Sequence, residues 1–255
     1  MLAVFDANVR KVLIELRRYL PNTISLVVTF YAIFLAMFLG ITVIGDPSAA
    51  EANLRFAIVG NAFWLLLILG INSMGFEITT EATRGTLEQL AMSPVGMATI
   101  LFARMAGTLA VYLVIAVAML VLTMATAGQW LAFDVPLLLC ILLPTFVGVM
   151  GVGYAVAGLA LVYKQVSAFL QITQFVFLGM AFVPLALAPA LELAPIVKGI
   201  DMVRTAMIDG AAFGDFGLRD WGSLAVNALV YFWLGVLAYR LAERRAVGRG
   251  LLGQY

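Results

Sequence analysis

The side chains that could do chemistry are scarce, and several of them gather in one short stretch. Residues 75–95, GFEITTEATRGTLEQLAMSPV, hold Glu77, Glu81, Arg84 and Glu88 in a chain that is 64% hydrophobic and 11% charged. Helical spacing places Glu77 beside Glu81, and Glu81 beside Arg84, on one helix face. The pattern indicates that the second apolar helix continues out of the membrane into a polar end before the next apolar segment.

Most catalytic chemistry is excluded by residue type. The chain has no histidine and a single cysteine, Cys140, so imidazole ligands, histidine-based triads and an intrachain disulfide are ruled out. The predicted spans offer neither a ligand cluster for a metal nor an activating base for a serine nucleophile. We therefore expect no catalytic, metal-binding or cofactor-binding residue in this chain.

A nucleotide site of the Walker A type is also excluded. That loop needs a lysine directly after a glycine, whereas the three lysines, Lys11, Lys164 and Lys198, follow an arginine, a tyrosine and a valine. If ATP drives this protein, ATP and Mg²⁺ must bind to another chain.

The composition predicts an all-α integral membrane protein. Mean hydropathy is +1.07, and the charged fraction is well below the roughly 25% of soluble domains. Six segments are long and apolar enough to cross about 30 Å of hydrocarbon as helices. They are residues 23–45, 54–76, 97–127, 135–163, 166–188 and 222–242, within a single membrane domain covering 1–255.

Residues 1–21 have a different pattern. Six apolar side chains share one helical face, and four basic side chains form a stripe: Phe5, Val9, Val12, Leu13, Leu16 and Leu20, and Arg10, Lys11, Arg17 and Arg18. This pattern favours an amphipathic helix in the membrane interface, with its cations toward anionic headgroups. Packing of the helix against the rest of the protein is the alternative.

Lysine and arginine counts predict the orientation. With six spans, both termini and alternate loops lie on one side, which holds eleven such residues: Arg10, Lys11, Arg17, Arg18, Arg84, Arg104, Lys164, Arg240, Arg244, Arg245 and Arg249. The other side holds four: Arg55, Lys198, Arg204 and Arg219. We expect a multi-pass protein of a prokaryotic plasma membrane with both termini in the cytoplasm. Residues 189–221 then form the longest external connection, with a short external helix or a re-entrant hairpin.

The polar stretch itself predicts a short cytoplasmic helix. Gly85 should end the second span, and Thr86 with Gln89 matches a capping box. Leu87, Leu90 and Ala91 then form a small apolar face. Because a short helix is marginal alone, this face needs a partner. The residues leave open whether that is the chain itself, the lipid surface or a separate subunit.

The segment from Glu81 to Pro94 resembles the E-x-x-x-G-T-L-E-Q-L-x-x-[ST]-P signature of ABC-2 type transporter permeases, at the expected place between spans two and three. The resemblance implies the membrane subunit of an ABC exporter, paired with a second permease copy or paralogue and with an ATP-binding subunit. It also implies contact with membrane lipids but not with nucleic acid. It places the coupling helix at the ATPase interface, with Glu81, Gly85, Thr86, Leu87, Glu88, Gln89 and Leu90.

Two other classes of function remain open from the residues. An ion-coupled carrier usually keeps ionisable side chains deep in the membrane, and no predicted span centre holds one. A membrane anchor or assembly subunit is the second. Polar side chains in spans two and five, Asn61, Asn72, Gln171 and Gln174, could line a substrate path or simply bond between helices. A largely uncharged path favours an amphipathic drug, an antibiotic or a lipid-like substrate.

Overall fold

The computed structural model describes residues 2–163 and 166–250, and the regular elements in these ranges are all helical. The predicted cytoplasmic Lys164 lies outside them. In chain order the elements are α1 (Leu2–Arg18), α2 (Leu20–Leu39), the π-helix η1 (Gly40–Ile44), α3 (Ala50–Thr83), α4 (Leu87–Ala91), α5 (Met97–Ala127), α6 (Val135–Tyr163), α7 (Ser167–Phe182), the 3₁₀-helix η2 (Pro189–Leu193), α8 (Val197–Ile208), the 3₁₀-helix η3 (Phe213–Asp215) and α9 (Leu218–Gly248).

Within the described residues, five helical segments are long and apolar enough to cross a membrane: α2 with η1, α3, α5, α6 and α9. The helix α7 is apolar but has only 16 residues, about 24 Å at 1.5 Å per residue. Its predicted range, 166–188, was too long. Val183 is extended and precedes Pro184, and the residue before a proline disfavours the α conformation. Five long helices and one short helix thus stand where six spans were predicted.

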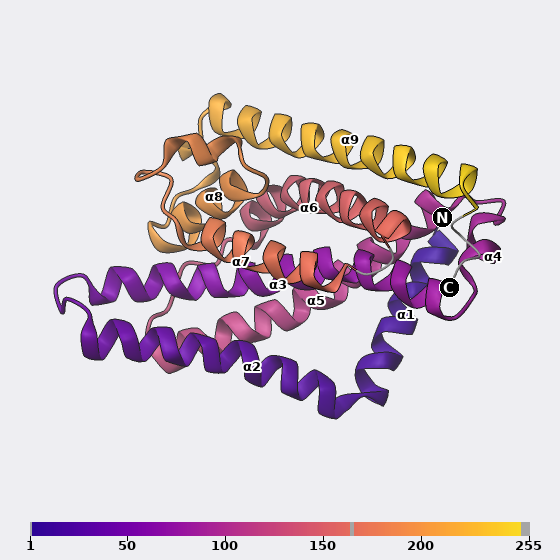
Figure 1. The fold of residues 1–255 in the computed structure, drawn as a ribbon. Helices are drawn as coiled ribbons and strands as arrows, with labels where there is room; N and C mark the ends of the chain where they lie inside the picture. The colour runs from indigo at the N-terminus through magenta and orange to yellow at the C-terminus, as the bar shows by residue number, and fades with distance from the viewer. Residues whose placement is uncertain (1, 164–165, 251–255) are drawn as a thin grey trace.

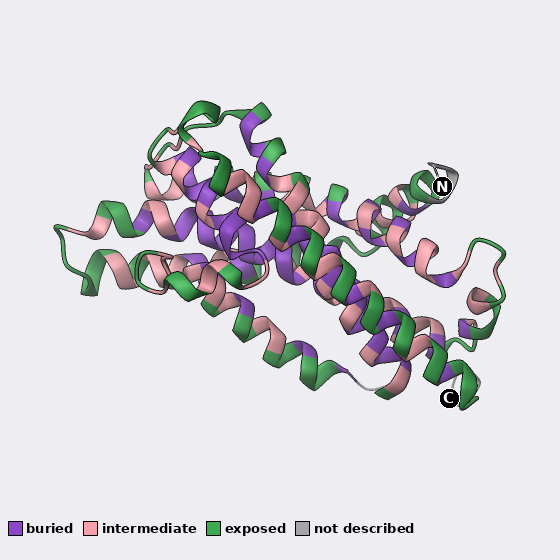
Figure 2. Cartoon of the chain, turned by 90° about the horizontal axis from the view of Figure 1, so that it is seen from above, coloured by how far each residue is buried: buried purple, intermediate pink, exposed green. Residues whose placement is uncertain are grey.

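Figure 1 shows the long helices running side by side, with α1 and α4 at one end of the bundle and α8 at the other. We call these the α4 end and the α8 end. The helix α3 is the central element, since it packs against α2, α5, α6, α7 and α8. In Figure 2 the buried residues concentrate in the middle of the bundle, while α9 presents a largely exposed outer face. The outer helices carry apolar residues on their outward faces as well as on the faces that pack inside the bundle. The outward faces can therefore contact lipid.

Small residues bring α6 and α9 into close contact. A Cβ on Gly151 would overlap the carbonyl of Tyr231, and one on Gly235 would overlap the carbonyl of Gly151. A Cβ on Gly158 would lie 3.1 Å from the Cα of Tyr239. Glycine at these positions lets two backbones approach, as in other membrane helix pairs.

The helix α1 packs against α5 rather than standing free. The Cβ position of Gly107 on α5 lies 3.4 Å from the backbone nitrogen of Val9, and Asn8 on the same face of α1 is buried. Leu13 and Ile14 remain exposed. The helix therefore has one face on the protein and apolar side chains on another, so its interfacial placement stays a prediction.

Candidate functional site

An ion cluster lies at the α4 end and joins three helices. Lys11 of α1 lies 3.0 Å, Nζ to Oε1, from Glu77 of α3. Arg104 of α5 contacts Glu77 through Nη1, and the same nitrogen lies 2.8 Å from Oε1 of Glu81. The side chains of Arg104 and Glu81 are 22% and 13% exposed. Such half-buried, charge-assisted bonds fix the relative positions of the helices that carry them.

The same cluster holds the start of α4. Gly85 has φ of +70°, so it ends α3 in the left-handed conformation that glycine adopts at no steric cost. The hydroxyl of Thr86 donates to the carboxylate of Glu81. The predicted capping box is wrong, because Thr86 makes no cap bond to the helix that follows it. Its hydroxyl turns back to α3 because Glu81 offers a charged acceptor there.

The surface of α4 is divided between the bundle and the solvent. Leu87 is 2% exposed within the core, and Leu90 packs against that core from its edge. Glu88 and Gln89 are exposed. Beyond the helix, Met92 is 76% and Val95 is 46% exposed. The chain itself therefore covers the side of this helix that carries Leu87. The outward surface is formed by Glu88 and Gln89 and by Met92 and Val95, which follow the helix.

A cavity of about 620 Å³, here called the polar cavity, lies next to the ion cluster, between α1, α2, α3, α5 and α7. Two of the four predicted path residues, Asn72 of α3 and Gln174 of α7, line it. Charged, amide and aromatic side chains share its wall with aliphatic ones. Its volume lies within the range of roughly 300–1,000 Å³ typical of ligand sites.

The other two path residues lie elsewhere. Asn61 is fully buried, and neither its Nδ2 nor its Oδ1 has a hydrogen-bond partner among the described residues. Gln171 is exposed on α7. The structure thus brings Asn72 and Gln174 to one cavity and separates Asn61 and Gln171 from it.

At the α8 end, a charged side chain enters the bundle from a segment that the sequence places outside the spans. Arg204 of α8 is 7% exposed. Its guanidinium carbon lies 3.5 Å from the ring centroid of Phe56, and Nη2 donates to the carbonyl of Ala181. A cation over an aromatic face gains attraction that grows as water is excluded. Arg204 therefore ties α8 to α3 and α7.

Ion pairs also hold α8 to the start of α9. Lys198 Nζ lies 2.7 Å from Asp220 Oδ1 and 3.4 Å from Glu192 Oε1. Although burial lowers the pKa of Lys198, these carboxylates outweigh burial and raise it above its ordinary value. Burial raises the pKa of Asp201 despite the nearby Lys198 and Arg204. The α8 end thus carries charged side chains that pair between α8, η2 and α9.

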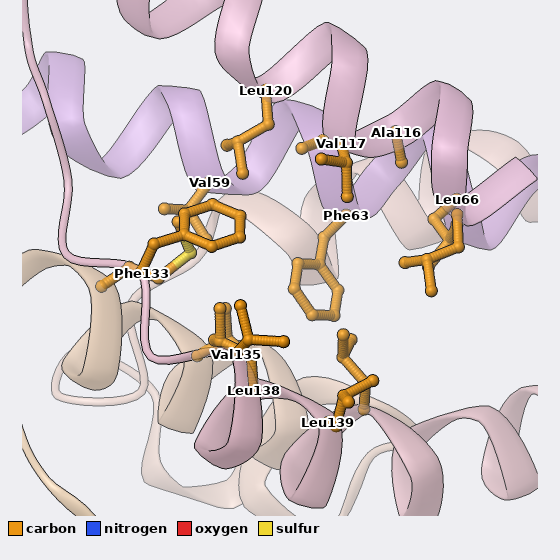
Figure 3. Close-up of a pocket in the computed structure, with 15 residues that line it drawn as sticks. Val59, Phe63, Leu66, Ala116, Val117, Leu120, Phe133, Val135, Leu138 and Leu139 are labelled. Atoms are coloured by element: carbon orange, nitrogen blue, oxygen red, sulfur yellow. The ribbon is translucent and has the colours of Figure 1, made fainter.

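An apolar cavity of about 200 Å³ lies between α3, α5, α6 and α8, and Figure 3 shows its wall. The rings of Phe63 and Phe133 and the aliphatic side chains of Leu120 and Leu138 are among the side chains that line it. Such a wall offers dispersion contacts but no polar atom to orient a ligand.

The chain matches the family model described as ABC-2 family transporter protein over residues 46–237. This chain belongs to the ABC-2 transporter family. It is therefore a transmembrane permease, the membrane component of an ABC-type transport system. Neither the search of curated proteins nor that of solved structures gave a match.

The matched region of this ABC-2 permease includes α3, α4 and α5, and so Glu77, Glu81 and Arg104. Lys11 and the rest of α1 precede it. Sequence reasoning did not include Lys11, Glu77 or Arg104 among the site residues. A signal was present, because two carboxylates at the C-terminal end of a helix oppose the helix dipole and need nearby cations.

Proposed function

We propose that this chain is the permease subunit of an ATP-driven ABC exporter, with ATP and Mg²⁺ bound by a separate subunit that docks at α4. One observation carries the proposal. In a member of the ABC-2 family, a short helix with an exposed outer surface is joined through Thr86 and Glu81 to the ion cluster of α1, α3 and α5. A push on α4 would reach three helices through these bonds.

The contacts that would transmit a movement of α4 to the long helices are few and polar. Thr86 begins α4 and bonds Glu81, Glu81 bonds Arg104 of α5, and Arg104 shares Glu77 with Lys11 of α1. Because Leu87 is buried beside this route, α4 cannot tilt without moving its neighbours. ATP-driven closure of the partner would in this way change the packing of α1 and α5 on α3. A second permease copy or a related chain would complete the transport path.

The polar cavity supports an amphipathic substrate. Asn72 and Gln174 offer hydrogen bonds in a wall that also holds charged, aliphatic and aromatic side chains. The cavity is therefore more charged than the largely uncharged path expected from the sequence. A drug-like, antibiotic or lipid-like molecule presents both kinds of surface. Outward movement follows from the exporter class that the coupling-helix signature implies.

Co-purification tests the docking surface. In a tagged chain co-expressed with its ATP-binding subunit, Met92→Asp with Val95→Asp should lower the captured ATPase at least tenfold, because both exposed apolar side chains would become charged. The matched control is Leu218→Asp, since Leu218 is 90% exposed at the α8 end. It should leave capture unchanged.

Normal capture and normal transport-linked ATP hydrolysis by the double variant would reject the surface formed by α4 and the residues that directly follow it, Met92 to Val95, as the docking surface. Transport that survives ATP depletion but stops when the ion gradient is removed would reject the ATP-driven mechanism and support an ion-coupled carrier.

A further inference from the structure

One face of α3 lines the polar cavity, and the side chains on this face change from apolar to polar to charged along the helix. Ile68 and Leu69 line one end, Asn72 and Ser73 follow, and Arg84 lines the other end. At 1.5 Å per residue, this wall extends about 24 Å from Ile68 to Arg84. An occupant of the whole cavity must therefore have an apolar part and a charged part.

The charges that line the cavity divide into a paired and an unpaired set. Lys11, Arg104 and Glu77 belong to the ion cluster together with Glu81. Arg84 and Glu15 also line the cavity, yet neither forms an ion pair within the described ranges 2–163 and 166–250. One positive and one negative group thus face the same space without pairing with each other.

These two groups also line an adjoining hollow of about 480 Å³ along α1, to which Arg10 and Arg18 contribute. The charged end of the cavity therefore adjoins a second charged hollow. An amphiphile could enter with its polar part at this end.

A buried donor points to a specific polar ligand. Asn8 of α1 lines the cavity and is 7% exposed, and its Nδ2 has no hydrogen-bond partner in the described part of the chain. A buried amide donor without a partner has lost its hydrogen bonds to water and gained none in return, which is unfavourable. An acceptor oxygen on a bound molecule would satisfy it.

From these observations we infer that the polar cavity binds one zwitterionic phospholipid whose headgroup carries a phosphate and a primary ammonium group. The phosphate lies at Arg84 and Asn8, the ammonium lies at Glu15, and an acyl chain follows Leu26, Phe30 and Leu69. Charge complementarity selects a zwitterionic headgroup, because a single-charge headgroup leaves either Glu15 or Arg84 uncompensated. Only a primary ammonium can also donate hydrogen bonds to the carboxylate of Glu15, which a quaternary ammonium cannot do. The inference rests on the cavity proposed above for the substrate, but it concerns binding alone, so its test needs neither ATP nor the docking partner.

Native mass spectrometry of the purified chain, titrated with phospholipids, tests this inference. We expect one phosphatidylethanolamine to remain bound at least tenfold more tightly than phosphatidylglycerol or phosphatidylcholine. Glu15→Gln should remove this preference while retaining phosphatidylglycerol. Arg84→Gln and Asn8→Leu should each weaken all three lipids. Arg245→Gln, an exposed arginine of α9 away from the cavity, is the control and should change nothing.

Equal binding of the three lipids, or an unchanged preference in Glu15→Gln, would overturn the inference. Free phosphoethanolamine is the second probe. If it displaces the lipid at similar concentration, the site recognises a soluble headgroup, and the phospholipid assignment is wrong. Because Glu15 and Arg84 are exposed at the charged end, both variants should elute as the wild type does in size-exclusion chromatography.

Discussion

Arg104 is the residue on which the ion cluster depends, because it contacts both carboxylates of α3. Within residues 2–163 and 166–250, the Lys11 side chain contacts Glu77 and the Thr86 side chain contacts Glu81, and neither contacts both. Without Arg104, Glu81 would keep a hydroxyl donor but lose its cation while its side chain stays 13% exposed. A half-buried carboxylate without a cation is costly, since desolvation penalises its charge.

We predict that Arg104→Gln destabilises the chain by about 1–3 kcal/mol, between the values for exposed and for buried ion pairs. Thermal unfolding in detergent measures the change. Arg10→Gln is the control, because Arg10 and its partner Asp6 are 74% and 63% exposed, and it should shift stability by less than about 0.5 kcal/mol. If the two variants unfold alike, the cluster is not a structural link.

Arg104→Gln should also retain the ATPase subunit while lowering the transport gained per ATP.

At the scale of elements, the close packing of α6 against α9 can be traced to individual glycines. Their contact depends on the absence of side chains, since the carbonyls of Gly151 and Tyr231 occupy the positions where Cβ atoms of Gly235 and Gly151 would stand. Backbone atoms cannot rotate away as a flexible side chain can. Any larger residue must therefore separate the two helices.

We expect Gly151→Val to destabilise the chain by at least about 3 kcal/mol, at the upper end of typical overpacking costs, and to lower the monodisperse fraction in detergent. Gly222→Ala in α9 is the matched control, because no atom lies within 4 Å of its Cβ position. That change should be neutral or stabilise the helix by up to about 1 kcal/mol. Wild-type unfolding of Gly151→Val would show that the close α6–α9 contact does not form.

At the scale of the whole molecule, the bundle has two unlike ends. The helices α1 and α4 lie at one end and α8 at the other (Figure 1). The α4 end has the ion cluster and the polar cavity, while the α8 end has the ion pairs of Lys198. Basic residues predominate on the predicted cytoplasmic side, which includes α1 and the α3–α5 connection. The predicted orientation therefore places the α4 end in the cytoplasm, where the proposed ATPase subunit would bind.

Single-cysteine labelling in a Cys140→Ser background tests this orientation. Thr83→Cys, at an exposed position of the α4 end, should react with an impermeant maleimide only after the membrane is opened. Phe213→Cys, 57% exposed near the α8 end, should react from the outside of intact cells. Reversed labelling would place α4 outside and contradict the coupling proposal as well.

Local pattern alone determined the membrane class, the helical fold and the bounds of two long helices, because hydrophobic length and glycine or proline breaks act within a few residues. The segments 97–127 and 135–163 match α5 and α6, and α3 ends at Thr83, just before the Gly85 that was predicted to end it. The signature in residues 81–94 also pointed to the ABC-2 family, and the family model that matches residues 46–237 confirms that assignment.

Only the tertiary structure decided which side chains meet. It joined Lys11, Glu77, Glu81 and Arg104 across three helices, buried Leu87 and Arg204, and placed Asn72 and Gln174 on one cavity while separating them from Asn61 and Gln171. Periodicity gives the face of a helix on which a residue lies, but not the neighbour that covers that face. Pairing between helices depends on their packing, which no local spacing encodes.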